Sequence, residues 1–228
     1  MVLPRVYRKA TEQVIQTFDF IDIASGIGFV EYFGGNHGAG GPSGAHILSK
    51  AKFFSDQVST VQSITSETTY TKFSDLDFDL VFNNAQTIEG EILCVIPSAV
   101  KAGTGESFQH FINVIIRKFD GTTETDIREV SGAFATITNL GTNDYDYDLT
   151  TIRLKMPSTL FKRGDTFRMT VEKFIKSNTQ IAAFSVIGND PENRAKGPTE
   201  DTNGGGVDFT FGTEVSRMSV LIPFKVDL

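Results

Sequence analysis

The chain has 228 residues, of which 39% are hydrophobic and 21% are charged, and its formal net charge is −7. These proportions exclude a disordered chain, a coiled coil and a collagen, and the length suits one large domain that buries its core without disulfides. An acidic protein repels phosphate backbones, so we expect no strong nucleic-acid binding.

The first twelve residues differ from the rest of the chain in charge. Arg5, Arg8 and Lys9 lie there with no acidic residue before Glu12. We interpret residues 1–12 as an N-terminal arm that docks on an acidic neighbour, with a solvated basic terminus as the alternative. No composition shift marks a second boundary, so residues 13–228 are expected to form a single β-sandwich domain.

The beginning of the chain also bears on where the protein is made. It lacks the apolar stretch of a signal peptide. No run approaches the ~18 apolar residues of a membrane-spanning helix. We therefore expect a protein that is made in a cytoplasm, is not secreted through a signal peptide and has no membrane span.

Apolar and polar residues alternate with a period of two over much of the chain, which predicts half-buried strands. With 20 Phe, 21 Gly and no Trp, the composition favours strands and turns. The alternation is clearest at 76–82, 152–156, 167–171 and 218–226, and further strands are expected near 14–23, 27–33, 58–64, 68–73, 88–96, 108–118, 127–138, 180–187 and 207–211. About a dozen short strands predict an all-β fold, an antiparallel β-sandwich of jelly-roll type.

The same alternation assigns a core of two packed sheets. The residues expected to face inward are Phe78, Leu80, Phe82, Phe167, Met169, Val171, Val220, Ile222 and Phe224. Pro223 lies inside the last series and predicts either an edge strand or a bulge there. Residues 157–165 are interpreted as one helical turn that Gly164 ends before the next strand.

Two long glycine-rich loops are expected, at 34–44 and 188–206. Loops of this length are usually functional, and we place them at subunit contacts or on an exposed tip. In the second loop, Asp190 and Arg194 are expected to pair or to cap a turn, because Asn-Asp-Pro favours a turn start. These two residues, with the three basic residues of the arm, are the candidate interface residues.

Acidic residues alternate in two places. Asp75, Asp77 and Asp79 are interpreted as a solvated strand face. Asp144, Asp146 and Asp148 adjoin a predicted turn and are the candidates for metal ligands, as a Ca²⁺ site gathers carboxylates and carbonyls. They lack the glycine and distal glutamate of an EF-hand, so no metal is predicted.

No other pattern points to catalysis or to a cofactor. His37, His46 and His110 have no zinc-binding spacing, and His110 is interpreted as a sheet residue with a satisfied ring. The chain has no nucleophile elbow and no phosphate-binding loop. We therefore predict that the protein is not an enzyme, has no catalytic residues and binds no cofactor.

The chain resembles the single jelly-roll structural proteins of viruses, including phage. The features that carry this resemblance are the basic arm, the alternating strands, the turn at 160–167 that leads into a strand and the closing series 217–228. This resemblance implies a virion structural protein, a capsid or outer-shell or spike subunit, located in the virion. Its partners would be copies of itself and other virion proteins in a symmetric oligomer. The alternative is a carbohydrate- or receptor-binding β-sandwich module, with Tyr32, His37 and the second loop near the glycan or receptor.

Overall fold

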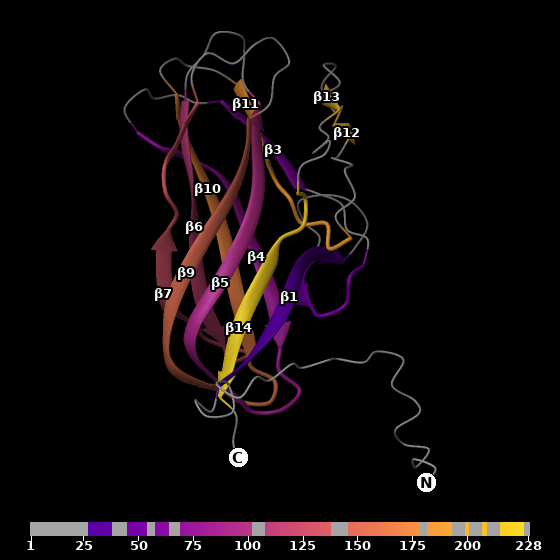
Figure 1. Ribbon diagram of the computed structural model, residues 1–228, viewed down its shortest axis with the longest axis vertical. Coiled ribbons are helices and arrows are strands. Elements are labelled where there is room, and N and C mark those ends of the chain that lie inside the picture. Colours follow the sequence, from indigo (N-terminus) through magenta and orange to yellow (C-terminus); the bar gives the residue numbers. More distant parts are fainter. Residues whose placement is uncertain are drawn as a thin grey trace.

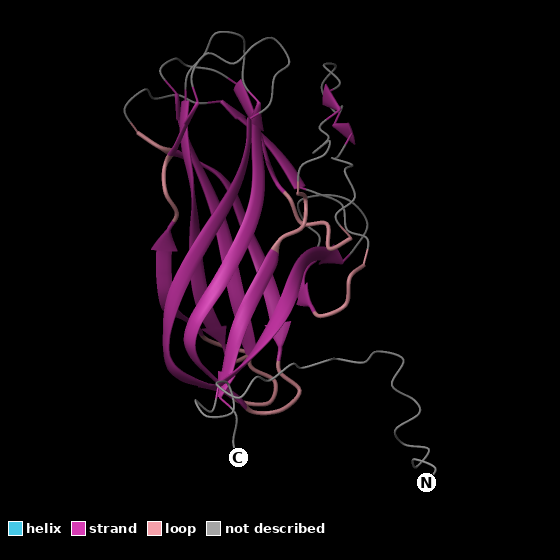
Figure 2. Cartoon of the chain, viewed as in Figure 1, coloured by secondary structure: helices cyan, strands magenta, loops and turns pink. Residues whose placement is uncertain are grey.

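The structure of the protein, a computed structural model, describes residues 27–37, 45–53, 58–63, 69–101, 108–137, 146–177, 182–192, 199–200, 207–208 and 215–225. Within these ranges the chain forms strands and turns and no helix (Figure 2). The strands are β1 (Ile27–His37), β2 (Ala45–Ser49), β3 (Val58–Ser63), β4 (Thr71–Val81), β5 (Gln86–Lys101), β6 (Phe108–Phe119), β7 (Glu124–Ser131), β8 (Ala135–Ile137), β9 (Asp146–Phe161), β10 (Thr166–Ser177), β11 (Ala182–Ile187), β12 (Thr199–Glu200), β13 (Val207–Asp208) and β14 (Ser219–Lys225). No helix in the described part of the chain could cross a membrane.

The strands form two layers. One path of paired strands runs β3-β11-β5-β14-β1-β2-β4-β10-β6-β7, with β9 paired to β5 and β8 paired to β6. Figure 1 shows β9, β5, β14 and β1 as a front layer and β4, β10 and β6 as a rear layer. All the pairs are antiparallel except β2 with β4. The predicted all-β antiparallel sandwich is confirmed, but the strands are not all short, since β5 and β9 have 16 residues each.

The core lies between the layers and follows the predicted alternation. Eight of the nine residues expected to face inward are buried, and Leu80 packs partly buried against them. Phe78 and Met169 stand opposite each other on paired strands, and both are fully buried. Phe167 lies within 6.0 Å of Phe161, measured between ring centroids. A period of two therefore assigned these side chains to the correct face.

The predicted helical turn at 157–165 is wrong. Residues 157–161 continue β9, and only residues 162–165 turn the chain toward β10. Asp165 accepts a hydrogen bond from the backbone N–H of Lys162 at 2.7 Å. Gly164 has a φ of 91°, a backbone angle that residues with a side chain rarely adopt. The sequence signal for a tight turn was real, but it belonged to a hairpin.

The glycine-rich stretch 34–44 is shorter as a loop than predicted. Residues 34–37 pair with β2 as the end of β1, and residues 38–44 lie outside the described residues. In the second stretch, residues 199–200 pair with 207–208. The arm, residues 1–12, lies outside the described ranges as well.

Pro223 marks a bulge, as the sequence indicated. The register between β14 and β5 shifts between Leu221 and Phe224. The edge-strand alternative is wrong, because β14 lies between β5 and β1. Gly90 of β5 lies beside this bulge with a φ of 122°, and a β-carbon there would be 3.4 Å from the Pro223 ring.

Candidate functional site

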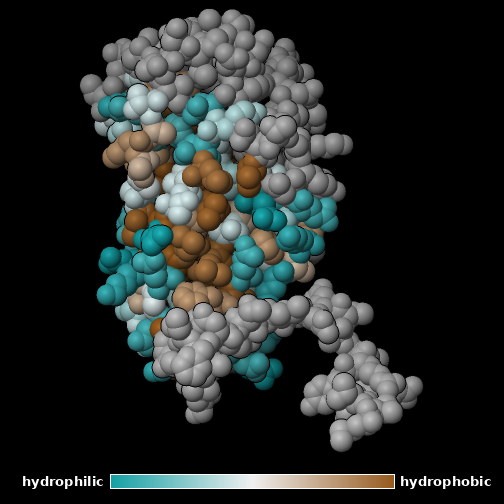
Figure 3. All heavy atoms as spheres, in the orientation of Figure 1, coloured by the Kyte–Doolittle hydropathy of each residue, from teal (hydrophilic) through white to brown (hydrophobic). Residues whose placement is uncertain are grey.

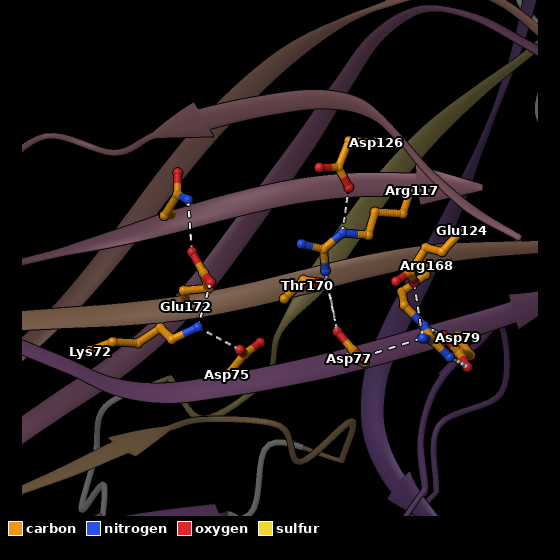
Figure 4. Close-up of polar contacts among 11 residues, drawn as sticks. Lys72, Asp75, Asp77, Asp79, Arg117, Glu124, Asp126, Arg168, Thr170 and Glu172 are labelled. Carbon is orange, nitrogen blue, oxygen red and sulfur yellow. Dashed lines mark hydrogen bonds and ion pairs between the residues drawn. The ribbon is translucent and has the colours of Figure 1, made fainter. Parts of the chain in front are cut away.

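The outer face of the rear layer carries a network of charged pairs (Figure 4). Arg168 donates two hydrogen bonds of 2.8 Å to the carboxylate of Asp79 and one of 3.0 Å to Glu124. The hydrogen bonds to Asp79 are the main reason why the pKa of Arg168 is raised. Asp75 in turn lies 2.7 Å from the ammonium group of Lys72.

Asp77 completes this row by accepting a hydrogen bond of 2.6 Å from the Thr170 hydroxyl. Arg117 lies 3.9 Å from the same carboxylate. Each acid of the Asp75–Asp77–Asp79 set thus faces a cationic side chain of this protein. The arrangement is the solvated strand face that the sequence predicted.

A polar cluster lies in the core at the end where β5 and β10 finish and β6 and β9 begin. It contains Ser98, His110, Lys173, Asp146 and Asp148. The ammonium group of Lys173 donates a hydrogen bond of 2.7 Å to the Ser98 hydroxyl, and both residues are fully buried. Burial lowers the pKa of Lys173 to about 7, although Asp148 and Asp146 oppose this shift.

His110 lies in the same cluster and is fully buried. Its Nε2 atom is 3.6 Å from the carboxylate of Asp146, which is long for a hydrogen bond, and neither ring nitrogen has a hydrogen-bond partner among the described residues. Burial lowers the pKa of His110, and the carboxylate of Asp146 opposes the shift. His110 is a sheet residue, as predicted, but its ring is not satisfied by the described residues.

The candidate metal ligands meet a cation that belongs to the protein. Asp146 and Asp148 both act electrostatically on the buried Lys173, and Asp148 accepts a hydrogen bond of 2.6 Å from Thr150. Asp144 lies outside the described residues. Where the structure describes the chain, it brings together no group of three His, Cys, Asp or Glu side chains suited to a metal ion.

The Ser98–Lys173 pair contains a hydroxyl and an amine, the groups of a base-activated nucleophile, but neither group is accessible to a substrate. A serine hydroxyl within hydrogen-bond distance of an amine is a recognised catalytic arrangement. Here both side chains have 0% exposure, so neither touches a substrate in this structure. We assign the pair to the core.

Sequence reasoning singled out His110, Asp146 and Asp148 but missed Ser98 and Lys173, although a signal for these two was present. Lys173 continues the inward series Phe167, Met169 and Val171, and Ser98 continues the inward series of β5. A polar residue at an inward position of a strand is the signal that could have found them.

A cleft opens at the opposite end of the sandwich, with a volume of about 600 Å³. Strands β1, β2, β4 and β14 and the turn between β4 and β5 contribute its lining. Its lining residues are Gly28, Val30, Tyr32, Leu48, Ser49, Lys50, Leu80, Val81, Phe82, Asn83, Asn84, Gln86, Phe224 and Lys225. This size lies within the range that holds small-molecule ligands.

The short strand β2 explains why the cleft exists. β2 has five residues and pairs with β4 through only two of them, His46 and Ile47. Beyond Ser49 none of the described strands fills the space between the start of β1 and the end of β4. Gly28 adds to this space, because it occupies an inward position of β1 without a side chain.

The cleft combines apolar side chains with a basic rim, and polar atoms form the larger share of its lining surface. The side chains of Val30, Leu80 and Phe224 are among its apolar lining. Lys50 and Lys225 also line it and are exposed, and none of the described lining residues carries a carboxylate. This local charge is opposite to the charge of the whole chain, which is −7.

Tyr32 links the interior to the rim. Its ring lies below the ammonium group of Lys50, which is 5.6 Å from the ring centroid, and burial raises the pKa of Tyr32 to about 12. The hydroxyl is therefore a hydrogen-bond donor at neutral pH. The sequence placed Tyr32 and His37 together near a ligand, but His37 pairs with Ala45 at the other end of β1.

Of the five candidate interface residues, the structure describes Asp190. It is 1% exposed, and its carboxylate accepts a hydrogen bond of 3.1 Å from the backbone N–H of Glu192. Asp190 therefore caps the turn, as predicted. Arg5, Arg8, Lys9 and Arg194 lie outside the described residues, so the interface role of this set stays a prediction.

No protein-family model and no curated protein matches the chain. Among solved structures it is similar to two crystal structures of a CocE/NonD family hydrolase from Staphylococcus aureus, with TM-scores of 0.42 and 0.41 and identities of 14% and 13%. These alignments cover 87% of this chain and 36% and 37% of the hydrolase chains.

The chain is also similar to chains of infectious bursal disease virus, strains Gx and Gt, with TM-scores of 0.32 and 0.26 and 9% identity. These alignments cover 85% of this chain and 42% and 43% of the virus chains. This chain therefore spans less than half the length of each of these neighbours.

The comparisons contradict two predictions made from the sequence. The virion structural function, together with its carbohydrate- or receptor-binding alternative, is not kept, because hydrolase structures are among the structural neighbours. The prediction that the protein is not an enzyme is withdrawn for the same reason. The physical reason is that alternation reports a fold, and one fold serves many functions.

The comparisons support the resemblance to viral structural proteins only in part. Virus chains are among the structural neighbours, at low TM-scores and 9% identity. A phage source, a virion location and a homo-oligomer are not tested by the comparisons. Such distant likenesses carry no activity from one protein to another, so they assign no function to this chain.

Proposed function

We propose that the cleft between β1 and β4 binds a small amphiphilic anion, a molecule with an apolar chain and a carboxylate head group. The observation that carries this proposal is the pairing of an apolar interior with Lys50 and Lys225 and no acidic lining residue among those described. Ligand sites combine apolar walls with placed polar groups, and this cleft has both, with the larger share of its lining surface polar.

Each part of such a ligand has a matching part of the cleft. An apolar chain of about ten carbons would lie against Val30, Leu80 and Phe224, and each buried methylene contributes ~0.8 kcal/mol. The carboxylate would lie at the rim, between the two lysine ammonium groups. Tyr32, which keeps its proton at neutral pH, also lines the cleft and can donate a hydrogen bond there.

The test is calorimetric titration of the purified chain with dodecanoate, with the neutral alcohol dodecanol as the matched ligand. We expect dodecanoate to bind more tightly than dodecanol, by about tenfold at low salt. The double variant Lys50→Met/Lys225→Met should bind both ligands equally. Lys176→Met, which changes a lysine on the rear layer, should bind as the wild type does.

Two outcomes would contradict the proposal. One is that neither ligand binds, and the other is that the double variant keeps the preference for the carboxylate. The variant Val30→Trp narrows the cleft with a larger apolar side chain. It should weaken the binding of both ligands alike if the alkyl chain of the ligand lies inside the cleft.

A further inference from the structure

The outer face of the front layer carries a strip of apolar side chains at positions where a solvated sheet would be polar. Figure 3 shows apolar residues gathered across this face. Leu93 and Val95 of β5 and Leu221 of β14 occupy outward positions between buried neighbours and are only half-buried, and Phe29 of β1 is 41% exposed. An antiparallel sheet that faces water carries polar residues at such positions.

The rear layer shows the contrast. Its outer face carries the network of charged pairs described above, in which each acid faces a cation (Figure 4). The same face also carries a cluster of aromatic rings, Tyr70, Phe111, Phe134 and Phe174. Apart from these rings, the sandwich presents paired charged side chains to water on its rear side. On its front side it leaves an apolar strip that a partner would cover.

One row of this face is arranged with opposite charges at its two ends. The pairing registers place Arg153 of β9 beside Leu93, Leu93 beside Leu221, and Leu221 beside Glu31 of β1. The row therefore reads cation, leucine, leucine, anion from one edge of the layer to the other.

A two-fold axis parallel to the strands makes this row complementary to itself. Two copies that meet face to face about such an axis place β9 of one copy opposite β1 of the other. Arg153 of one protomer then faces Glu31 of the partner subunit, and the reciprocal pair forms at the other edge, as in any isologous contact. The leucines meet in the middle.

The charges at the two ends are available for this exchange. Arg153 has one pair within the chain, at 3.4 Å to Glu91, and the two side chains are 70% and 55% exposed. Such an exposed pair contributes only ~0–1 kcal/mol, so the arginine can change partners at little cost. Glu31 is exposed and has no ion pair within the described part of the chain.

We propose that this face, the front face of β9, β5, β14 and β1, docks a second copy of the same chain as a two-fold dimer. The order of charges along the row indicates that the partner is a second copy, because a two-fold axis parallel to the strands places each charge of the row opposite its counter-charge. Aligned packing of two sheets is an established geometry for such a contact.

Sedimentation equilibrium of the purified chain tests the proposal. We expect a dimer at micromolar concentrations. Leu221→Glu should raise the dissociation constant of this dimer by about tenfold or more. Arg153→Glu and Glu31→Arg should each weaken the dimer severalfold. The double reversal Arg153→Glu/Glu31→Arg should restore it, because each reversed charge again meets its opposite.

The control variant is Arg163→Glu, a charge reversal in the turn that follows β9, which should not change the dimer. Circular dichroism shows whether each variant is folded. A wild type that is monomeric up to about 100 µM would overturn the proposal. So would a Leu221→Glu variant that remains as dimeric as the wild type, or a double reversal that is weaker than both single reversals.

Discussion

Replacing the buried Lys173 by methionine should remove a specific pH dependence from the stability of the protein. Lys173 is fully buried, and the pKa of its amine is about 7 in the folded chain against an ordinary 10.5. At pH values between these two pKa values, the amine of residue 173 binds more protons in the unfolded chain than in the folded chain. Stability therefore rises with pH through this window, and below pH 7 the penalty for burying the charge is present in full.

The size of the effect follows from the same two pKa values. At pH 7 the buried lysine costs the folded state about 4 kcal/mol, and at pH 9 about 2 kcal/mol. The wild type should therefore gain about 2 kcal/mol of stability, relative to Lys173→Met, between pH 7 and pH 9. The variant also leaves the hydroxyl of Ser98 without its donor, which costs ~1–3 kcal/mol at either pH and so cancels from the difference.

Urea denaturation at pH 7, 8 and 9 measures this difference directly. Lys176→Met is the matched control, because Lys176 lies on the same strand but outside the core and should show no such change. A wild type and a Lys173→Met variant whose stabilities remain parallel from pH 7 to pH 9 would show that the buried amine does not titrate in this window.

Three further changes test the packing and the surface. Phe167→Ala should cost ~3–5 kcal/mol of stability in chemical denaturation, because Phe167 is fully buried between the layers, and a loss under 1 kcal/mol would contradict its place in the core. Gly188→Ala should lower the melting temperature, since its new β-carbon would lie 2.7 Å from the carbonyl oxygen of Ser216, and an unchanged melting temperature would contradict that close approach. Arg168→Met breaks the paired hydrogen bonds to Asp79 and should cost about 1 kcal/mol at low salt and less at high salt, so a loss independent of salt would contradict an electrostatic cause.

The core could be predicted from the sequence because it depends on local alternation. Phe78, Phe167 and Ile222 each lie in a run with a period of two, and each is buried. The polar cluster obeys the same rule, but its members belong to four strands. Only the pairing registers show that Ser98 and Lys173 meet at one end of the core.

The cleft could not be predicted, because its position depends on contacts between distant parts of the chain. Lys50 and Lys225 are far apart in sequence and come together only because β14 pairs with β1 and β1 with β2. The length of β2, which leaves the space open, is set where its pairing with β4 stops. A single sequence carries no local signal for either event.

The parallel contact between β2 and β4 gives the molecule a seam. Only two residue pairs join the strands there, whereas ten join β4 to β10. Backbone amides along the seam should exchange with solvent sooner than those inside either layer, because opening there breaks few hydrogen bonds. A molecule bound in the adjoining cleft would contact both sides of the seam at once, so occupancy would slow this exchange and raise the melting temperature in proportion to ligand concentration.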